Sequence, residues 1–425
     1  MPETAQTSTW PRWQRWGFRF FFVYFLLEIA PWNFLSFMIP GVSKYTYYPS
    51  FLLQNYLFRW HETPRWSHAP TGSGDTLDDW VLKLAYLILA VLATVVWSLF
   101  DRRRTDYNQL YAWLKISLRY YLAFIMFTYG IIKLFALQMP YPNLAQLYTP
   151  LGEFTPMRFT WMFMGYSQPY QFVSGLLETL GGLLLLSRRT LVPGLLLLTG
   201  VLSNVVMLNF FYGVPVKLFS SLLLFICLFL LIDYVKPLYQ FFWLRLPDVR
   251  LKHGLNPTAK WPKALTISLK VLFFILAFGL TFYQSYQRYT NYASRPDFDL
   301  RGVYDVVEFV DSTQTITSMV DTNRWNRLVI ERGWTEGSGY GHILRGTTEL
   351  EPVRVTVDST GMVKLIGSAG KGTLFEGTFT EVEPGLLQWE GQGATDRLVM
   401  TWRKREDHMT LPERKFMWVM EQKDF

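Results

Sequence analysis

Long apolar stretches alternate with shorter polar ones over the first two thirds of the chain. Each stretch approaches the roughly 20 residues that a helix needs to cross a bilayer. The pattern predicts seven membrane-spanning helices, at residues 16–38, 81–100, 114–137, 170–187, 191–211, 217–235 and 265–288. The first stretch contains Glu28 and lacks a small-residue cleavage site, so we expect a retained helix and not a removed signal peptide.

The pattern changes to a period of two residues after position 295, with turn residues between the alternating stretches. This predicts about eight short antiparallel strands, within 301–310, 323–333, 353–368, 372–382, 385–391, 397–406 and 415–422. We expect turns at 358–361, 367–372 and 384–385. The fold class is therefore a membrane all-α bundle with a C-terminal all-β domain, either an up-and-down barrel or a sandwich.

These elements divide the chain into four parts. They are N-terminal spans and an outer loop (1–113), a four-helix core (114–235), a basic loop with the last span (236–295) and the β domain (296–425). Within the outer loop, residues 50–60 predict an interfacial helix. Thr76, followed by Asp78 and Asp79, predicts a helix start with acids at its positive end.

Charge gives the helices an orientation. Residues 1–295 carry a net charge of +14, whereas residues 296–425 carry −6. With a cytoplasmic N-terminus, 14 Lys and Arg residues lie in inner segments and 5 in outer loops. The positive-inside rule favours this arrangement and places the β domain outside the cytoplasm. The sequence thus predicts a bacterial inner-membrane protein that contacts lipids, with no basic stripe for nucleic acid.

Thiol and metal chemistry have little support. Cys227 is the single cysteine and lies in an apolar run, so we expect a small buried hydrophobe. His61, Glu62 and His68 lack the tight spacing of metal ligands, and we predict no metal site. His342 and His408 are isolated in the β domain, where no nucleophile–base pair stands out.

Three charges inside apolar helices mark the best candidate site: Arg119, Lys133 and Glu178. A charge facing hydrocarbon costs about 2.5–3.5 kcal/mol on insertion scales, so such residues usually face a protein interior. Arg119 and Lys133 point within about 40° of each other on one helix and lie about 21 Å apart along it. Arg119 belongs near the cytoplasmic end, where its side chain can also reach headgroups. Lys133 and Glu178 lie at similar depth near the outer end, and we expect them to form an ion pair.

Other polar residues of the same helices extend this site. Tyr129 lies one turn from Lys133. Glycines near Glu178 permit close helix contact. Glu28 and Arg19 face opposite sides of the first helix, so Glu28 needs a partner on another helix, such as an arginine or a tyrosine. The predicted site comprises Glu178 and Lys133 as catalytic residues, with Tyr129, Asn204, Asn209, Lys217 and Arg119 binding a ligand.

The spacing of these residues resembles a known family. Arg119, Gly130 and Lys133, then Glu178, Gly181 and Gly182 before Arg188 and Arg189, resemble the DoxX/DoxD-like membrane proteins. The resemblance covers the four-helix core, residues 114–235. It implies an integral membrane subunit associated with quinone-linked or sulfur-related redox chemistry. The extra helices and the β domain resemble the larger members of that family, and the single cysteine argues against a thiol-based variant.

Two weaker likenesses concern the architecture. The combination of a helical bundle with an external β-rich region is similar to the membrane domain of vitamin K-dependent carboxylases. Within the tail, Gly302–Tyr304 and the stretch 414–419 resemble lipocalin strands, which is an analogy of fold alone.

Three functions follow as hypotheses. The first is a redox-associated subunit with an outer-leaflet pocket for a quinone or similar amphipathic molecule. Lys133 would hydrogen-bond a carbonyl oxygen, Glu178 would orient Lys133 or carry a proton, and Tyr129 and Asn209 would line the pocket. With no haem or flavin motif, electrons would come from a partner protein. The second is a non-enzymatic scaffold or lipid-handling protein whose β domain binds a periplasmic partner or an apolar ligand. The third is a transporter, against which no inverted repeat is visible.

Overall fold

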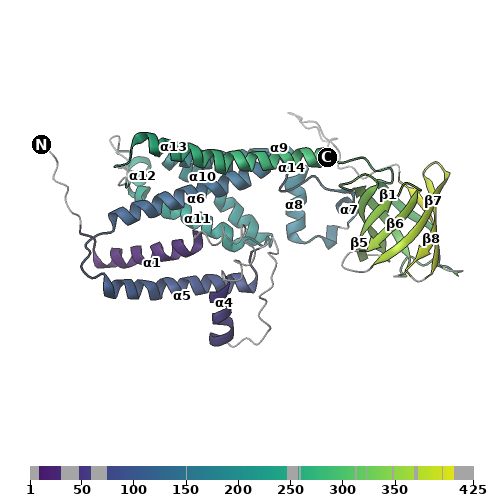
Figure 1. Cartoon of the computed structure of the whole chain (residues 1–425), viewed down its shortest axis with the longest axis horizontal. Coiled ribbons are helices and arrows are strands. Elements are labelled where there is room, and N and C mark those ends of the chain that lie inside the picture. Colours follow the sequence, from purple (N-terminus) through teal and green to yellow (C-terminus); the bar gives the residue numbers. More distant parts are fainter. Residues whose placement is uncertain are drawn as a thin grey trace. The chain divides into compact units, whose positions relative to one another are not determined.

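The computed structural model divides the chain into two compact units (Figure 1). Unit 1 comprises residues 1–139 and 167–286, and unit 2 comprises residues 140–166 and 287–425. The structure describes residues 9–29, 47–58, 74–149, 151–246, 257, 260–311, 314–321, 323–346, 349–367, 372–394 and 396–405.

Unit 1 is helical, and a helix occupies each of the seven predicted positions. The helices are α1 (Arg12–Ile29), α4 (Tyr48–Leu52) with η1 (Leu53–Leu57), α5 (Leu77–Phe100), α6 (Asn108–Leu134), α9 (Gln168–Leu185), α10 (Leu191–Phe211), α11 (Lys217–Leu231) with η3 (Ile232–Tyr234), α12 (Val235–Phe242), α13 (Lys263–Phe274) with η4 (Ile275–Gly279), and α14 (Leu280–Ala293), which runs into unit 2. The helix expected within residues 50–60 is present as α4 and η1. The described part of the first predicted span ends at Ile29.

Within the described residues, four helical stretches are long and apolar enough to cross a membrane: Leu77–Phe100, Leu191–Phe211, Lys217–Phe242 and Lys263–Ala293. The other three predicted spans, α1, α6 and α9, are helices that carry buried charged side chains. The structure is therefore that of a helical protein with four candidate spans, and the count of seven stays a prediction.

Local sequence explains how the helices begin and pack. Thr76 forms the predicted N-cap of α5, and its hydroxyl accepts a hydrogen bond from the Asp79 amide while the Asp79 carboxylate accepts one from the Thr76 amide. α1 packs on α5 and α6, and α9 lies between α6 and α10. Their apolar faces form one core, rich in leucine and phenylalanine, which also buries Cys227 as expected.

The β domain in unit 2 is a closed antiparallel barrel, which decides between the two predicted architectures. Its strands are β1 (Gly302–Asp311), β3 (Trp325–Arg332), β4 (Ser338–Arg345), β5 (Glu349–Val357), β6 (Met362–Gly367), β7 (Thr373–Glu383), β8 (Leu386–Gly393) and β9 (Arg397–Lys404), with β2 (Gln314–Thr315) as a short extension on β1. Each strand pairs with the next around the ring, and β9 pairs with β1, so no long edge is exposed.

One observed strand, β4, was not predicted from the sequence. Gly339 and Gly341 interrupt its alternating pattern of apolar and polar residues. These glycines permit close pairing, since a Cβ on Gly341 would lie 1.9 Å from the Val329 carbonyl oxygen of β3. The strand expected at 415–422 lies outside the described residues, as does His408. The turns expected at 358–361 and 384–385 are present, with Gly361 and Gly385 at positive φ.

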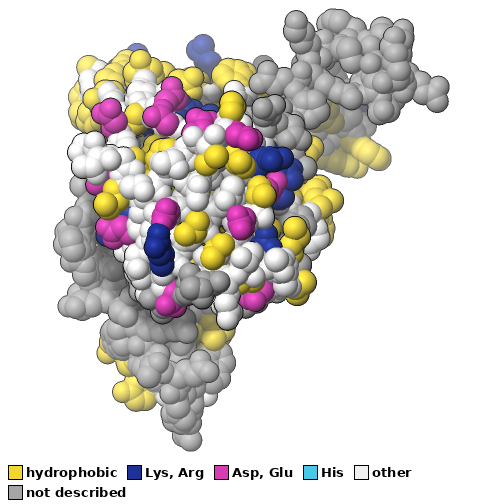
Figure 2. Space-filling view, turned by 90° about the vertical axis from the view of Figure 1, so that its right-hand side faces the viewer, with side chains coloured by type: hydrophobic (Ala, Val, Ile, Leu, Met, Phe, Trp, Pro, Cys, Tyr) yellow, Lys and Arg dark blue, Asp and Glu magenta, His cyan; other side chains and the backbone are white. Residues whose placement is uncertain are grey.

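The barrel interior is filled by large side chains. Trp325, Trp389 and Trp402 are buried, and the Trp402 ring centroid lies 6.3 Å from that of Trp325 and 5.8 Å from that of Trp389. Acidic, basic and apolar side chains are interspersed on the face of the molecule turned toward the viewer in Figure 2.

The loop between α6 and α9 belongs to the barrel unit. It contains α7 (Leu144–Leu147), η2 (Leu151–Glu153) and α8 (Pro156–Tyr166). The amide of Leu144 donates to Glu331 Oε1 of β3 at 2.8 Å, and Ala145 packs with the buried side chains of Val303 and Val329. The segment therefore covers one face of β1 and β3.

Candidate functional site

Two glycines bring α6 and α9 into backbone contact. A Cβ on Gly130 would lie 2.8 Å from the Gly175 carbonyl oxygen, and one on Gly175 would lie 2.6 Å from the Gly130 carbonyl oxygen. The close approach predicted around Glu178 is therefore present. It places the last turns of α6 against the first turns of α9, where Lys133 and Glu178 lie.

Lys133 and Glu178 form the ion pair that the sequence predicts. Lys133 Nζ donates to Glu178 Oε1, and the two side chains are 7% and 3% exposed. The other carboxylate oxygen, Oε2, is buried and has no hydrogen-bond partner among the described residues. The hydroxyl of the neighbouring Thr179 is also buried and has no hydrogen-bond partner among the described residues. Since buried polar atoms normally have partners, this pair retains hydrogen-bonding capacity for another group.

Tyr129, another predicted site residue, lies one turn before Lys133 on α6. Its hydroxyl interacts electrostatically with Glu178, and its ring centroid lies 6.1 Å from that of Phe219 on α11. Asn209 is buried, but its amide donates to Ser220 Oγ at 2.9 Å. Asn204 is exposed on α10. The structure thus joins Tyr129 to the pair and gives Asn209 a separate partner.

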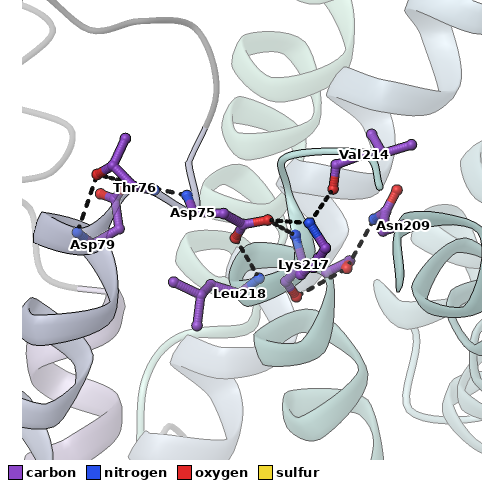
Figure 3. A network of polar contacts seen from close by, with 8 residues as sticks. Asp75, Thr76, Asp79, Asn209, Val214, Lys217 and Leu218 are labelled. Atoms are coloured by element: carbon purple, nitrogen blue, oxygen red, sulfur yellow. Dashed lines mark hydrogen bonds and ion pairs between the residues drawn. The ribbon is translucent and has the colours of Figure 1, made fainter. Parts of the chain in front are cut away.

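Asn209 and Lys217 belong to a second network, shown in Figure 3, in which the Ser220 hydroxyl accepts from Asn209 and donates to the Lys217 carbonyl oxygen at 3.2 Å. The Asp75 carboxylate accepts hydrogen bonds from the backbone amides of Lys217 and Leu218 at 2.7 and 2.9 Å, and lies 3.5 Å from Lys217 Nζ. Asp75 therefore caps the N-terminus of α11, where a carboxylate is favoured by the helix dipole. Asp75 is not among the predicted site residues, although it directly precedes the helix start predicted at Thr76.

The other charged residues of α1 and α6 also have defined environments. Arg119 is 7% exposed, so it is buried and does not lie at the surface. Glu28 pairs with Lys83 of α5 and accepts a hydrogen bond from Tyr24. Arg19 instead donates to Tyr107 and Ser98, which confirms that it does not pair with Glu28. Lys83 was overlooked, although it is a lone charge in an apolar stretch like the others.

His342 on β4 is a titratable group of the β domain with a shifted pKa. Its pKa is lowered from the ordinary value of 6.5 because burial disfavours the charged ring, and the Arg158 cation adds to the effect. His342 Nδ1 is buried with no hydrogen-bond partner among the described residues. The folded structure therefore favours the neutral form of the His342 ring.

The lowered pKa predicts that acid destabilises the barrel. The unfolded chain binds a proton on His342 at higher pH than the folded chain, so the contribution to stability is full above pH 6.5 and declines as pH falls below it. We expect the free energy of unfolding of wild type to fall more steeply than that of His342→Gln between about pH 7 and 5. Denaturant titrations at several pH values measure this, and parallel profiles would contradict it.

The described residues contain no group of three His, Cys, Asp or Glu side chains arranged to hold a metal ion. The candidates His61, Glu62 and His68 lie outside the described residues.

Comparisons with known proteins give one relative. No protein-family model and no solved structure matches the chain. A region of 124 residues is 31% identical to the uncharacterized protein YwoB of Bacillus subtilis (strain 168), covering 27% of this chain and 73% of that protein. The chain therefore belongs to the same family as YwoB.

Proposed function

We propose that the chain is an integral protein of the bacterial inner membrane with seven spanning helices, a cytoplasmic N-terminus and a periplasmic β domain. Helices at all seven apolar positions support this count, because buried partners accommodate the charges of α1 and α9. The distribution of Lys and Arg supports the orientation.

Within that membrane, the protein would act as a DoxX-like, redox-associated subunit that binds the polar head of a quinone-like molecule. The observation that carries this proposal is the buried Lys133–Glu178 pair, in which Glu178 Oε2 has no partner among the described residues. A quinone fits this donor and acceptor set, since its carbonyl oxygen accepts hydrogen bonds and its reduced form donates them. A periplasmic or membrane redox protein, docking through residues 296–425, would complete the electron path.

The side chains of the pair have distinct roles in this scheme. Lys133 Nζ donates to the bound oxygen while remaining paired with Glu178. Glu178 Oε2 accepts a proton from the reduced headgroup or returns one, and the low dielectric of the site strengthens both interactions. Tyr129 lies close enough to Glu178 to line the same position. The quinone itself would supply the redox chemistry.

Ligand retention tests the proposal. Full-length protein is purified in mild detergent, and its quinone content per chain is measured by mass spectrometry of solvent extracts. We expect Glu178→Gln and Lys133→Met to weaken binding about tenfold or more, since each removes a hydrogen bond to a charged group. The matched control is Glu28→Gln, which alters the second buried carboxylate–lysine pair of the helical unit and should retain quinone.

The result has two clear readings. Equal quinone content in wild type, Glu178→Gln and Glu28→Gln, all monodisperse, would contradict the quinone proposal. An apolar ligand that stays bound to the Glu178 variant would instead support the second candidate.

The second candidate is a scaffold or lipid-handling protein whose barrel binds an apolar ligand. Its support is the pair of indole N–H groups of Trp389 and Trp402, which are buried and lack acceptors among the described residues. An apolar molecule carrying one hydrogen-bond acceptor would satisfy such a group.

A further inference from the structure

A second group of charges lies toward the other end of α6. It consists of Arg119 on α6, Arg188 three residues after the end of α9, and Lys270 on α13. We call these three residues the basic cluster. Arg119 is 14 residues, or about 21 Å, from Lys133 along the helix, so the cluster is separate from the Lys133–Glu178 pair.

Helix packing explains how the cluster forms. A Cβ on Gly182 of α9 would lie 3.2 Å from the Ala123 carbonyl oxygen, so the two helices remain close as α9 approaches Arg188. The ring centroids of Tyr120 and Phe273 are 4.8 Å apart, which brings α13 against α6 one turn from Lys270. Three elements thus converge near Arg119.

Arg119 is the buried member of the cluster. Arg119 is only 7% exposed, and its Nε has no hydrogen-bond partner among the described residues. Its guanidinium carbon lies 5.1 Å from the centroid of the Tyr120 ring. A buried guanidinium with an unused N–H is costly unless another group completes its hydrogen bonds.

The electrostatic surroundings point to the sign of that group. Arg119 interacts electrostatically with Arg188, and Lys270 interacts with both arginines. Arg119 forms a side-chain hydrogen bond with Tyr120 and also interacts electrostatically with Tyr234. The nearby carboxylate of Asp233 accepts instead from Lys115 and Tyr111, at 2.7 and 3.0 Å. Three like charges, from α6, α13 and the segment after α9, therefore converge where an anion would reduce their repulsion.

We propose that the basic cluster binds a phosphate group. A guanidinium presents its N–H donors in a planar fork that matches phosphate oxygens, and an ammonium adds a point charge. Basic pockets between membrane helices on the cytoplasmic side are a known geometry for anionic lipid headgroups. The shared chemistry is the phosphate, carried either by an anionic phospholipid or by a small soluble anion.

Native mass spectrometry of delipidated full-length protein measures the binding. Phosphatidylglycerol, phosphatidylcholine and inorganic phosphate are titrated separately. We expect saturable binding of phosphatidylglycerol or phosphate, and about tenfold weaker binding in Arg119→Gln and in Lys270→Gln, because each loses a charge-assisted contact. Selective binding of phosphatidylglycerol identifies a lipid headgroup, whereas equal binding of inorganic phosphate identifies a soluble ligand.

The matched control is Arg189→Gln. Arg189 is exposed, follows Arg188 directly and is not among the groups that act on Lys270. This variant should bind like wild type. Equal loss in all three variants would overturn the proposal by showing diffuse attraction to basic surface, as would the absence of anion binding by wild type. The half-exposed Lys270 keeps the test decisive even where Arg119→Gln fails to fold.

Discussion

Replacing Lys133 with methionine is expected to destabilise the helical unit by about 3–5 kcal/mol, because the change leaves a buried carboxylate without its partner. Glu178 is 3% exposed, and Lys133 is its hydrogen-bond donor. Titration with a denaturing detergent in mixed micelles measures the free energy of unfolding. The double variant Lys133→Met/Glu178→Leu removes both charges and should recover most of the loss, since apolar replacement of a whole pair is often neutral.

Lys83→Met provides the comparison for this prediction. It also removes the lysine from a buried carboxylate, but Glu28 keeps the hydrogen bond from Tyr24. We therefore expect a smaller loss than for Lys133→Met. If the double variant Lys133→Met/Glu178→Leu were as unstable as Lys133→Met alone, the loss of stability would not come from the unpaired carboxylate of Glu178.

Gly175→Ala is expected to cost about 1–3 kcal/mol, the usual range for overpacking a tight contact. The added methyl would lie 2.6 Å from the Gly130 carbonyl oxygen and 2.7 Å from Lys133 Cβ, so α6 and α9 must separate. Separation would also lengthen the Lys133–Glu178 contact and reduce ligand retention. The same unfolding titration measures the first effect, and the quinone assay measures the second.

Gly200 on α10 is the matched control, because a Cβ there meets nothing within 4 Å. Gly200→Ala should be neutral or slightly stabilising, by up to about 1 kcal/mol, through helix propensity alone. If the two alanine variants behaved alike, the close contact of α6 with α9 would have no energetic role.

The sequence predicts the ion pair because a buried charge in an apolar helix is rare and has few ways to be accommodated. Lys133 and Glu178 could be matched because they lie at similar heights along two neighbouring helices. The glycines near Glu178 indicated that these helices are in close contact. The same reasoning did not reach Lys217, whose partner Asp75 lies in the segment directly before α5. Loop conformation depends on few local constraints, so a contact separated by 142 residues leaves no periodic signal.

The barrel shows a similar division. Alternating apolar residues predict seven of its eight ring strands, whereas β4 was missed because its glycines contribute no side chains to the pattern. Closure into a ring depends on the pairing of β1 with β9, a long-range contact that no local pattern encodes. The burial of Arg119 was likewise not predicted. An arginine near the end of an apolar helix can be buried or can extend to the lipid headgroups, and the sequence pattern is the same in both cases.

The docking of residues 140–166 on β3 has a consequence for biosynthesis. The hydrogen bond from Leu144 to Glu331 joins residues 187 positions apart. At a translation rate of about 5–20 residues per second, Leu144 emerges roughly 10–40 s before its acceptor. During that interval, residues 140–166 have been synthesised, but α7 does not yet have strands β1 and β3 to pack on. The barrel unit is therefore assembled from an early segment and a late segment of the chain, and it cannot be completed before the C-terminal third has been synthesised.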